Sequence, residues 1–270
     1  MEVSPFLKRL VDANAPLWAA EAEVFRTYWD SPVRSSATDQ LWLFRQMFKE
    51  LINGFERAMS RLDAPHWALE SREGRDKMQA ESLVAHQELI HFCLLADVYE
   101  RLQVSGSHIL STSEIRAHGD WPENQKLMEL RARHRRLYGS IGRRAHHFTE
   151  GGFCTLHAEG MTLRGRGGID DLIADACGRI YNDEFEHMLR GVMETESERL
   201  VADEWETLTQ LTVEQLRLRI HMRNAQFSFP LSKERVQDLC DGQCAPIPFP
   251  FEQAAAICKA DHRARATMHA

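Results

Sequence analysis

The sequence predicts an all-α protein. Apolar residues recur at spacings of three, four and seven through most of the chain, which is the periodicity of amphipathic helices. No segment shows the strict alternation that is typical of a half-buried strand. Glycine and proline lie between the periodic segments, where helices are expected to end. The predicted helices cover residues 15–29, 37–62, 75–103, 125–164, 169–198 and 203–228.

The four central helices are expected to form two antiparallel hairpins joined by a longer connection at residues 104–124. They would make the core of a single domain, at about residues 37–198 of 1–270. The helices at 15–29 and 203–228 would flank this core. Residues 229–270 contain the extended, proline-rich stretch "CAPIPFPF". Because this stretch is so apolar, we expect it to pack on the helices as a C-terminal arm.

Composition and charge exclude several classes of protein. A net charge of -7 and a pI near 6.0 leave no basic surface for nucleic acid or an acidic membrane. No apolar run approaches the roughly 20 residues of a membrane span. The first ten residues lack the apolar core of a signal peptide, and six scattered cysteines do not form a disulfide framework. A reduced cytoplasmic protein is therefore expected, and the pair Cys240 and Cys244 lacks the further ligands of a zinc motif.

Two helices carry a glutamate and a histidine three residues apart inside an apolar stripe. In "RIYNDEFEHMLRG" these are Glu184 and His187, and in "AHQELIHFCLLADVYERL" they are Glu88 and His91. A carboxylate that faces a core needs a cation or a metal as its partner, because an unpaired buried charge is very unfavourable. Each pair lies in the middle of the second helix of a predicted hairpin.

Carboxylates at the same level on the first helices of the hairpins would complete a cluster. Counting back from the first connection places Glu50 level with Glu88, and Glu56 is the alternative, about 9 Å nearer the turn. In the second hairpin, the same counting places Glu150 level with Glu184.

One glutamate from each of two helices and Glu-x-x-His from each of two others resemble the ligand set of the ferritin-like diiron-carboxylate superfamily, over roughly residues 40–198. The resemblance implies a four-helix bundle core with additional N- and C-terminal helices. It also implies two metal ions, with Fe/Fe favoured and Fe/Mn or Mn/Mn as alternatives. The ligands would be Glu50, Glu88, His91, Glu150, Glu184 and His187. Carboxylate oxygens suit such ions and can bridge them, while one imidazole per ion would fix its geometry.

Residues beside the ligands are expected to orient them or to line a pocket. In the resembled family an aspartate often precedes the fourth-helix glutamate, so Asp183 would accept the ring N–H of His91. Gln87 stands at the equivalent place in the other hairpin and would accept from His187.

The helix around Glu150 carries further polar side chains. His147, Cys154 and His157 are expected on its face, either in a polar core or at the surface, or as a ligand, proton donor or substrate contact. Tyr181, one turn before Glu184, would lie near the metals or pack in the core. Gly151 and Gly152 weaken this helix and predict a kink or a π-bulge.

The resemblance implies a non-haem dimetal oxidase or oxygenase that activates dioxygen to oxidise a small organic substrate. Electrons would come from an external donor, and a homodimer is one option for its assembly. Two alternatives remain open: a non-enzymatic metal-binding or storage bundle, and a metal-free helical interaction protein.

Overall fold

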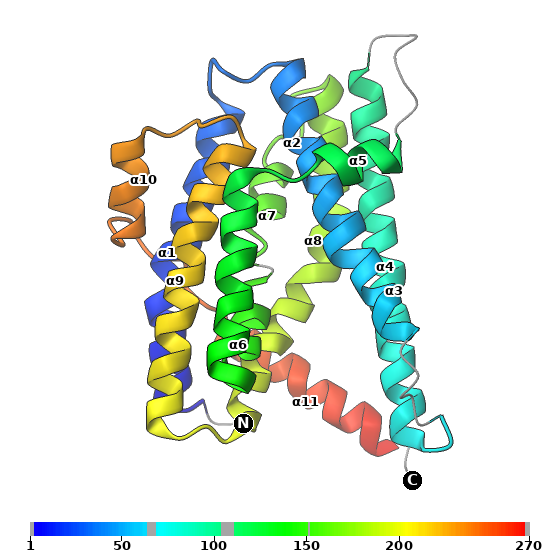
Figure 1. Cartoon of the computed structure of the whole chain (residues 1–270), viewed down its shortest axis with the longest axis vertical. Helices are drawn as coiled ribbons and strands as arrows, with labels where there is room; N and C mark the ends of the chain where they lie inside the picture. Colours follow the sequence, from blue (N-terminus) through cyan, green and yellow to red (C-terminus); the bar gives the residue numbers. More distant parts are fainter. Residues whose placement is uncertain (1–2, 64–68, 104–110, 151, 268–270) are drawn as a thin grey trace. The chain divides into compact units, whose positions relative to one another are not determined.

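The computed structural model describes residues 3–63, 69–103, 111–150 and 152–267. The protein is all-α, as predicted, and the described residues contain no strand. The order of elements, in the labels of Figure 1, is α1 (Pro5–Trp29), α2 (Ser36–Phe48), η1 (Lys49–Glu56), α3 (Arg57–Leu62), α4 (Arg72–Leu102), α5 (Thr112–His118), α6 (Pro122–Glu150), α7 (Thr155–Met161), α8 (Gly168–Glu194), η2 (Thr195–Glu198), α9 (Ala202–Gln226), α10 (Lys233–Cys240) and α11 (Phe251–Thr267).

Serine N-caps explain where several of these helices begin. A serine side chain accepts a hydrogen bond from the backbone N–H three residues later, which satisfies a donor that the first turn leaves without a partner. The capping residues are Ser4, Ser35, Ser71, Ser111 and Ser232.

The described helices also contain no segment long and apolar enough to cross a membrane. The chain divides into two compact units, which are described separately. Unit 1 comprises Met1–Ser31, Pro122–Thr162 and Cys177–Ala270, and unit 2 comprises Pro32–Trp121 and Leu163–Ala176. The single-domain organisation expected from the sequence stays a prediction.

Unit 1 is built on α1, α6 and α9, which lie side by side (Figure 1). Its apolar core includes the fully buried Leu7, Trp18 and Ile220. The C-terminal arm packs on this core, as predicted. Ile247 N–H donates to the carbonyl of Ala15, and Phe249 contacts Trp18 with 6.3 Å between ring centroids.

The sequence predicts one continuous helix at 125–164, and this prediction is wrong. Helix α6 reverses its direction at Gly139. This residue has φ 56° and ψ −119°, a conformation that favours glycine. Arg131 Nη2, before the turn, donates to the carbonyl of Thr149, 18 residues later, at 3.1 Å. In a straight helix these residues would be roughly 27 Å apart. Residues 122–138 and 140–150 are therefore two antiparallel arms, and we call them the first and second arm of α6.

The helix ends at Glu150, close to the position where the sequence predicts a kink or a bulge. Gly152 has φ 60° and Cys154 has φ 51°, so both lie in the left-handed region, and α7 begins at Thr155. Gly151 lies outside the described residues. The expectation that Cys154 and His157 continue the Glu150 face of one helix is therefore wrong.

Unit 2 packs α2, η1 and α3 along α4, with α5 against α2. Its buried side chains include Trp42, Leu43 and Met47 from the first helices and Leu95 and Val98 from α4. The predicted helix at 37–62 is uninterrupted in direction, but its central segment, Lys49–Glu56, is a π-helix. The predicted connection at 104–124 contains the short helix α5, and residues 104–110 lie outside the described part.

Candidate metal centre

Glu50, Glu88 and His91 come together in unit 2. One potential ligand atom from each lies within 4.8 Å of the other two. His91 Nδ1 lies 4.0 Å from Glu50 Oε2. The side chain of His91 is only 1% exposed and that of Glu50 12%, and Glu88 is partly buried. It is a group that could hold a metal ion.

The helices explain why these three side chains meet. Glu88 and His91 are three residues apart on α4, so they share one face of that helix. Glu50 is the second residue of the π-helix η1, which packs along α4. A π-helical turn contains an extra residue and often occurs at a functional site, because it shifts the direction of the side chains that follow. Gln46 Nε2 donates to Glu50 Oε1 at 2.6 Å and orients that carboxylate.

Gly54 provides the space that the Glu88 carboxylate occupies. A Cβ atom built at position 54 would lie 2.2 Å from Glu88 Oε2, far inside van der Waals contact. Any other residue at position 54 would displace the Glu88 carboxyl group. Glycine in the middle of a helix is unfavourable by roughly 1 kcal/mol relative to alanine, so its presence at this contact has a steric reason.

The alternative ligand Glu56 has a different partner. Arg116 on α5 forms a two-bond ion pair with Glu56, and its Nη1 atom donates to Glu56 Oε2 at 2.7 Å. The group with Glu88 and His91 contains Glu50, the glutamate that the counting from the loop boundary favoured.

The donor set fits a divalent cation of the first transition row. Two carboxylates supply anionic oxygens and one imidazole supplies a nitrogen, a combination that iron, manganese and zinc accept. Two carboxylates this close in a partly buried site repel each other, so a bound cation would stabilise them. Three protein ligands also leave coordination positions for further oxygens.

Glu150, Glu184 and His187 lie in unit 1, on α6 and α8. Glu150 ends the second arm of α6 and its side chain is 46% exposed, while Glu184 and His187 are partly buried. That these three residues share one metal centre with Glu50, Glu88 and His91 stays a prediction. The hydrogen bonds from His91 to Asp183 and from His187 to Gln87 also stay predictions.

Cys154 and Tyr181 belong to the surroundings of Glu184. Burial and the Glu184 carboxylate raise the pKa of the Cys154 thiol, which keeps it protonated. Burial and Cys154 also raise the pKa of Tyr181, whose ring stacks on Phe185 at 4.8 Å. His157 is buried on α7, 8% exposed, and His147 is exposed on α6. The Cys154 thiol is therefore neutral.

A buried ion cluster next to the Glu150 helix was missed from the sequence. Glu21 on α1 is 1% exposed and accepts hydrogen bonds from Arg219 and Arg223 of α9. Burial by itself would raise the pKa of Glu21, but the two guanidinium groups lower it to about 2. Arg219 Nη1 also donates to the carbonyl of Glu150 at 2.7 Å, so the cluster holds the end of α6.

The sequence contains a signal for this cluster. Glu21 interrupts the apolar segment "WAAEAEVF" in the same way that Glu184 interrupts its own stripe. An acidic residue in an apolar stripe predicts a buried partner, and here the partner is a pair of arginines.

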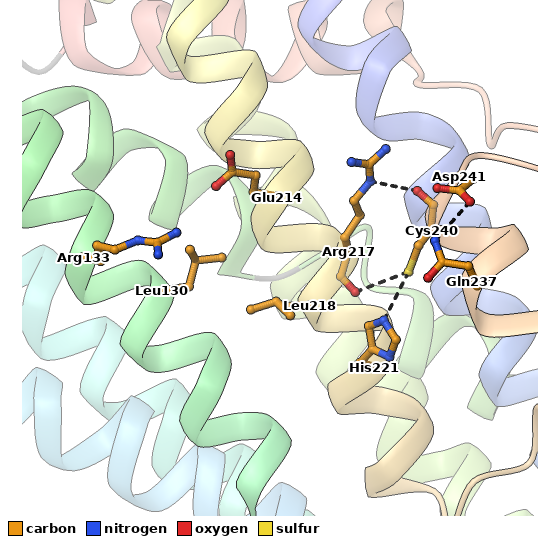
Figure 2. A pocket seen from close by; sticks show the side chains of 9 residues that line it. All are labelled: Leu130, Arg133, Glu214, Arg217, Leu218, His221, Gln237, Cys240 and Asp241. Atoms are coloured by element: carbon orange, nitrogen blue, oxygen red, sulfur yellow. Dashed lines mark hydrogen bonds between the residues drawn. The ribbon is translucent and has the colours of Figure 1, made fainter. Parts of the chain in front are cut away.

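An open groove of about 360 Å³ lies in unit 1 between α6, α9 and α10 (Figure 2). Its lining residues are Leu130, Arg133, Glu214, Arg217, Leu218, His221, Gln237, Cys240 and Asp241. Cys240 Sγ lies 3.7 Å from His221 Nε2, but burial raises the pKa of the thiol to about 11 and lowers that of His221. The groove thus offers a neutral thiol beside a neutral imidazole, and it includes none of the predicted metal ligands.

Comparison of the chain with protein-family models, curated proteins and solved structures found no match.

Proposed function

We propose that the protein is a dimetal carboxylate oxidase or oxygenase of the ferritin-like type. The observation that carries this proposal is the meeting of Glu50 with Glu88 and His91, three of the six residues that the motif predicts as ligands. The other three, Glu150, Glu184 and His187, would supply the matching half in a four-helix core. Iron is the favoured metal, and manganese is the alternative.

The side chains would have distinct roles. Glu50 and Glu88 would hold metal through their carboxylate oxygens, and His91 and His187 would each supply a ring nitrogen. Asp183 would orient His91 by accepting its ring N–H, and Gln87 would do the same for His187. Two bound iron ions would supply the electrons that reduce dioxygen, with an external donor restoring them. Cys154, His157 and Tyr181 would line the space for a small organic substrate, and the thiol, which burial keeps protonated, could donate a hydrogen bond there.

Metal stoichiometry tests this proposal directly. Purified full-length protein would be titrated with Fe(II) or Mn(II) without oxygen and then subjected to elemental analysis. We expect two ions per chain, and Glu88→Ala should lose metal because it removes a carboxylate ligand. Glu56→Ala is the matched control: it removes a glutamate of the same segment that pairs with Arg116, and it should keep both ions. Dioxygen uptake by the iron-loaded protein, with a change in its optical spectrum, would support the oxidase.

A single-ion, non-enzymatic metal-binding protein is the second candidate. The observation that favours it is that Glu50, Glu88 and His91 all belong to unit 2 and could hold an ion without a residue of unit 1. One ion per chain, lost in Glu88→Ala and retained in Glu184→Ala, would support it over the dimetal enzyme. No bound ion in any of these proteins would leave the metal-free interaction protein.

A further inference from the structure

His146 lies between a cation and the carboxylate of Glu150. Its ring is 2% exposed, on the second arm of α6. Nε2 faces Glu150 Oε1, one helical turn further on, at 3.4 Å. Nδ1, on the other edge of the ring, lies 2.8 Å from Nη1 of Arg135, which comes from the first arm. The turn at Gly139 brings these two arms together.

Arg135 determines which nitrogen of this ring carries the proton. A guanidinium group stays charged and can only donate hydrogen bonds, so the nitrogen that it contacts must accept. Nδ1 of His146 is therefore the acceptor. The neutral ring then has its hydrogen on Nε2, the atom that faces the carboxylate.

We propose that Arg135 and His146 are positioning residues for Glu150. Arg135 holds His146 in the Nε2–H form, and His146 then directs this N–H at one oxygen of the Glu150 carboxylate. Nε2 and Oε1 are 3.4 Å apart and do not form a hydrogen bond in the structure, so the proposed bond requires a small rotation of the carboxylate. Arg219 holds the main-chain carbonyl of the same residue, so Glu150 is controlled at both its backbone and its side chain. This inference rests on the proposed role of Glu150 as a metal ligand.

The same geometry excludes His146 as a ligand itself. A histidine and a glutamate four residues apart on a helix could bind one metal ion together. Coordination through Nε2 would require the proton to move to Nδ1, where it would point at the Arg135 cation. His146 is thus a residue that holds a ligand, and it does not compete for the metal.

Nitrogen NMR on the metal-free, full-length protein tests the tautomer. We expect Nε2 of His146 to carry the proton in the parent protein at mildly alkaline pH. In Arg135→Leu, the Nδ1–H tautomer should become more populated, because the guanidinium group no longer requires Nδ1 to accept. A proton on Nδ1 in the parent protein would overturn the inference.

Metal titration tests the positioning role with three variants. We expect His146→Leu to weaken binding of one of the two ions by roughly 10-fold or more, the usual effect of removing a group that orients a ligand. His146→Gln should retain binding, because an amide offers an acceptor to Arg135 and a donor to Glu150. His147→Leu is the matched control: His147 Nδ1 lies 3.9 Å from the same carboxylate, but the side chain is 61% exposed.

The outcomes separate this inference from the proposed function. If the parent protein binds two ions and His146→Leu binds both as tightly, the positioning role is wrong and the dimetal centre stands. An equal loss in His147→Leu would also overturn it. If the parent protein binds fewer than two ions, the dimetal proposal fails and the positioning role fails with it, while the NMR measurement still decides the tautomer.

Discussion

At the scale of single residues, Gly54 is the position where one methyl group would act directly on the candidate metal centre. Gly54→Ala would place Cβ 2.2 Å from Glu88 Oε2 and displace that carboxylate. In metal-free protein the end of the Glu88 side chain can move, so we expect the melting temperature to change little. In metal-loaded protein the carboxylate is fixed, and affinity should fall by roughly 10-fold, as for other changes next to a ligand.

Calorimetric titration with Mn(II) and thermal melts would check this. Gly191→Ala is the control, because a Cβ there meets no described atom within 4 Å. It should leave affinity unchanged and can stabilise the helix by up to about 1 kcal/mol. Unchanged affinity in Gly54→Ala would mean that Glu88 does not bind the metal.

Glu21 makes the stability of unit 1 sensitive to acid. Its pKa of about 2 in the folded protein lies below the value of 4.5 that the residue has when solvated. A lowered pKa adds stability that is complete above the unfolded value and is lost as pH falls from about 4.5 towards 2. The shift corresponds to roughly 3 kcal/mol.

Denaturant melts between neutral pH and pH values near 3 would measure this loss. Glu21→Gln should be destabilised by several kcal/mol at neutral pH, because it leaves two buried arginines without a counter-charge, and its stability should fall less in acid. Glu23→Gln is a useful comparison: Glu23 pairs with Arg235 at a partly exposed position, so its removal should change stability by about 1 kcal/mol or less.

At the scale of elements, the turn inside α6 depends on a second glycine. A Cβ at position 142 would lie 2.1 Å from the carbonyl oxygen of His134, which is backbone and cannot move aside. Gly142→Ala should therefore separate the two arms and destabilise the protein by about 2 kcal/mol or more. Ser140→Ala, at an exposed position in the same turn, should stay within about 0.5 kcal/mol of the parent. Equal stability of both variants in urea melts would contradict the hairpin.

The elements also show how far sequence periodicity reaches. Long amphipathic helices such as α4 and α8 could be predicted to within a few residues, because one apolar face determines them. The turn at Gly139 could not be predicted, because the apolar spacing continues through "YGSIG". Only the positive φ of Gly139 in the structure reveals the reversal. The π-helix η1 could not be predicted either, because its extra residue per turn depends on packing against α4.

The candidate site also contains residues that the sequence could predict and residues that it could not. Glu88 and His91 could be predicted because a fixed spacing on one helix sets their shared face. Predicting Glu50 required only the position of the loop between the first two helices of the predicted core. His146 was missed because its partner Arg135 reaches it across a hairpin that the sequence presents as a single helix.

At the scale of the whole molecule, bound metal should reverse the effect that removing a ligand carboxylate has on thermal stability. In the proposed dimetal centre, four carboxylates would repel one another without metal, so Glu184→Gln should be as stable as the parent or more stable. With Fe(II) or Mn(II), the parent should gain more in melting temperature than the variant, because binding to the folded state stabilises it. Thermal melts with chelator and with added metal would measure both. A variant that is simply destabilised, with no rise on adding metal, would contradict the dimetal centre.

Asp183→Asn should have a smaller effect than loss of a ligand. Metal affinity or activity is expected to fall by roughly 10- to 100-fold without unfolding, because Asp183 would orient His91 and would not itself bind the metal. Glu184→Ala should instead remove metal and activity together. Equal losses in the two variants would mean that Asp183 does more than orient its partner.

The pairing of α1 with α9 has a consequence for the order in which the protein can fold. Glu21 and Arg219 are 198 residues apart in sequence, so their contact closes a loop that contains most of the chain. During synthesis α1 leaves the ribosome long before α9 exists, and Glu21 must remain solvated until its arginines arrive. Most of unit 2, in contrast, is a single contiguous stretch of chain. We therefore expect unit 2 to acquire its structure first and α1 to be enclosed last, which leaves the apolar side of α1 as the surface most exposed to chaperones and aggregation during synthesis.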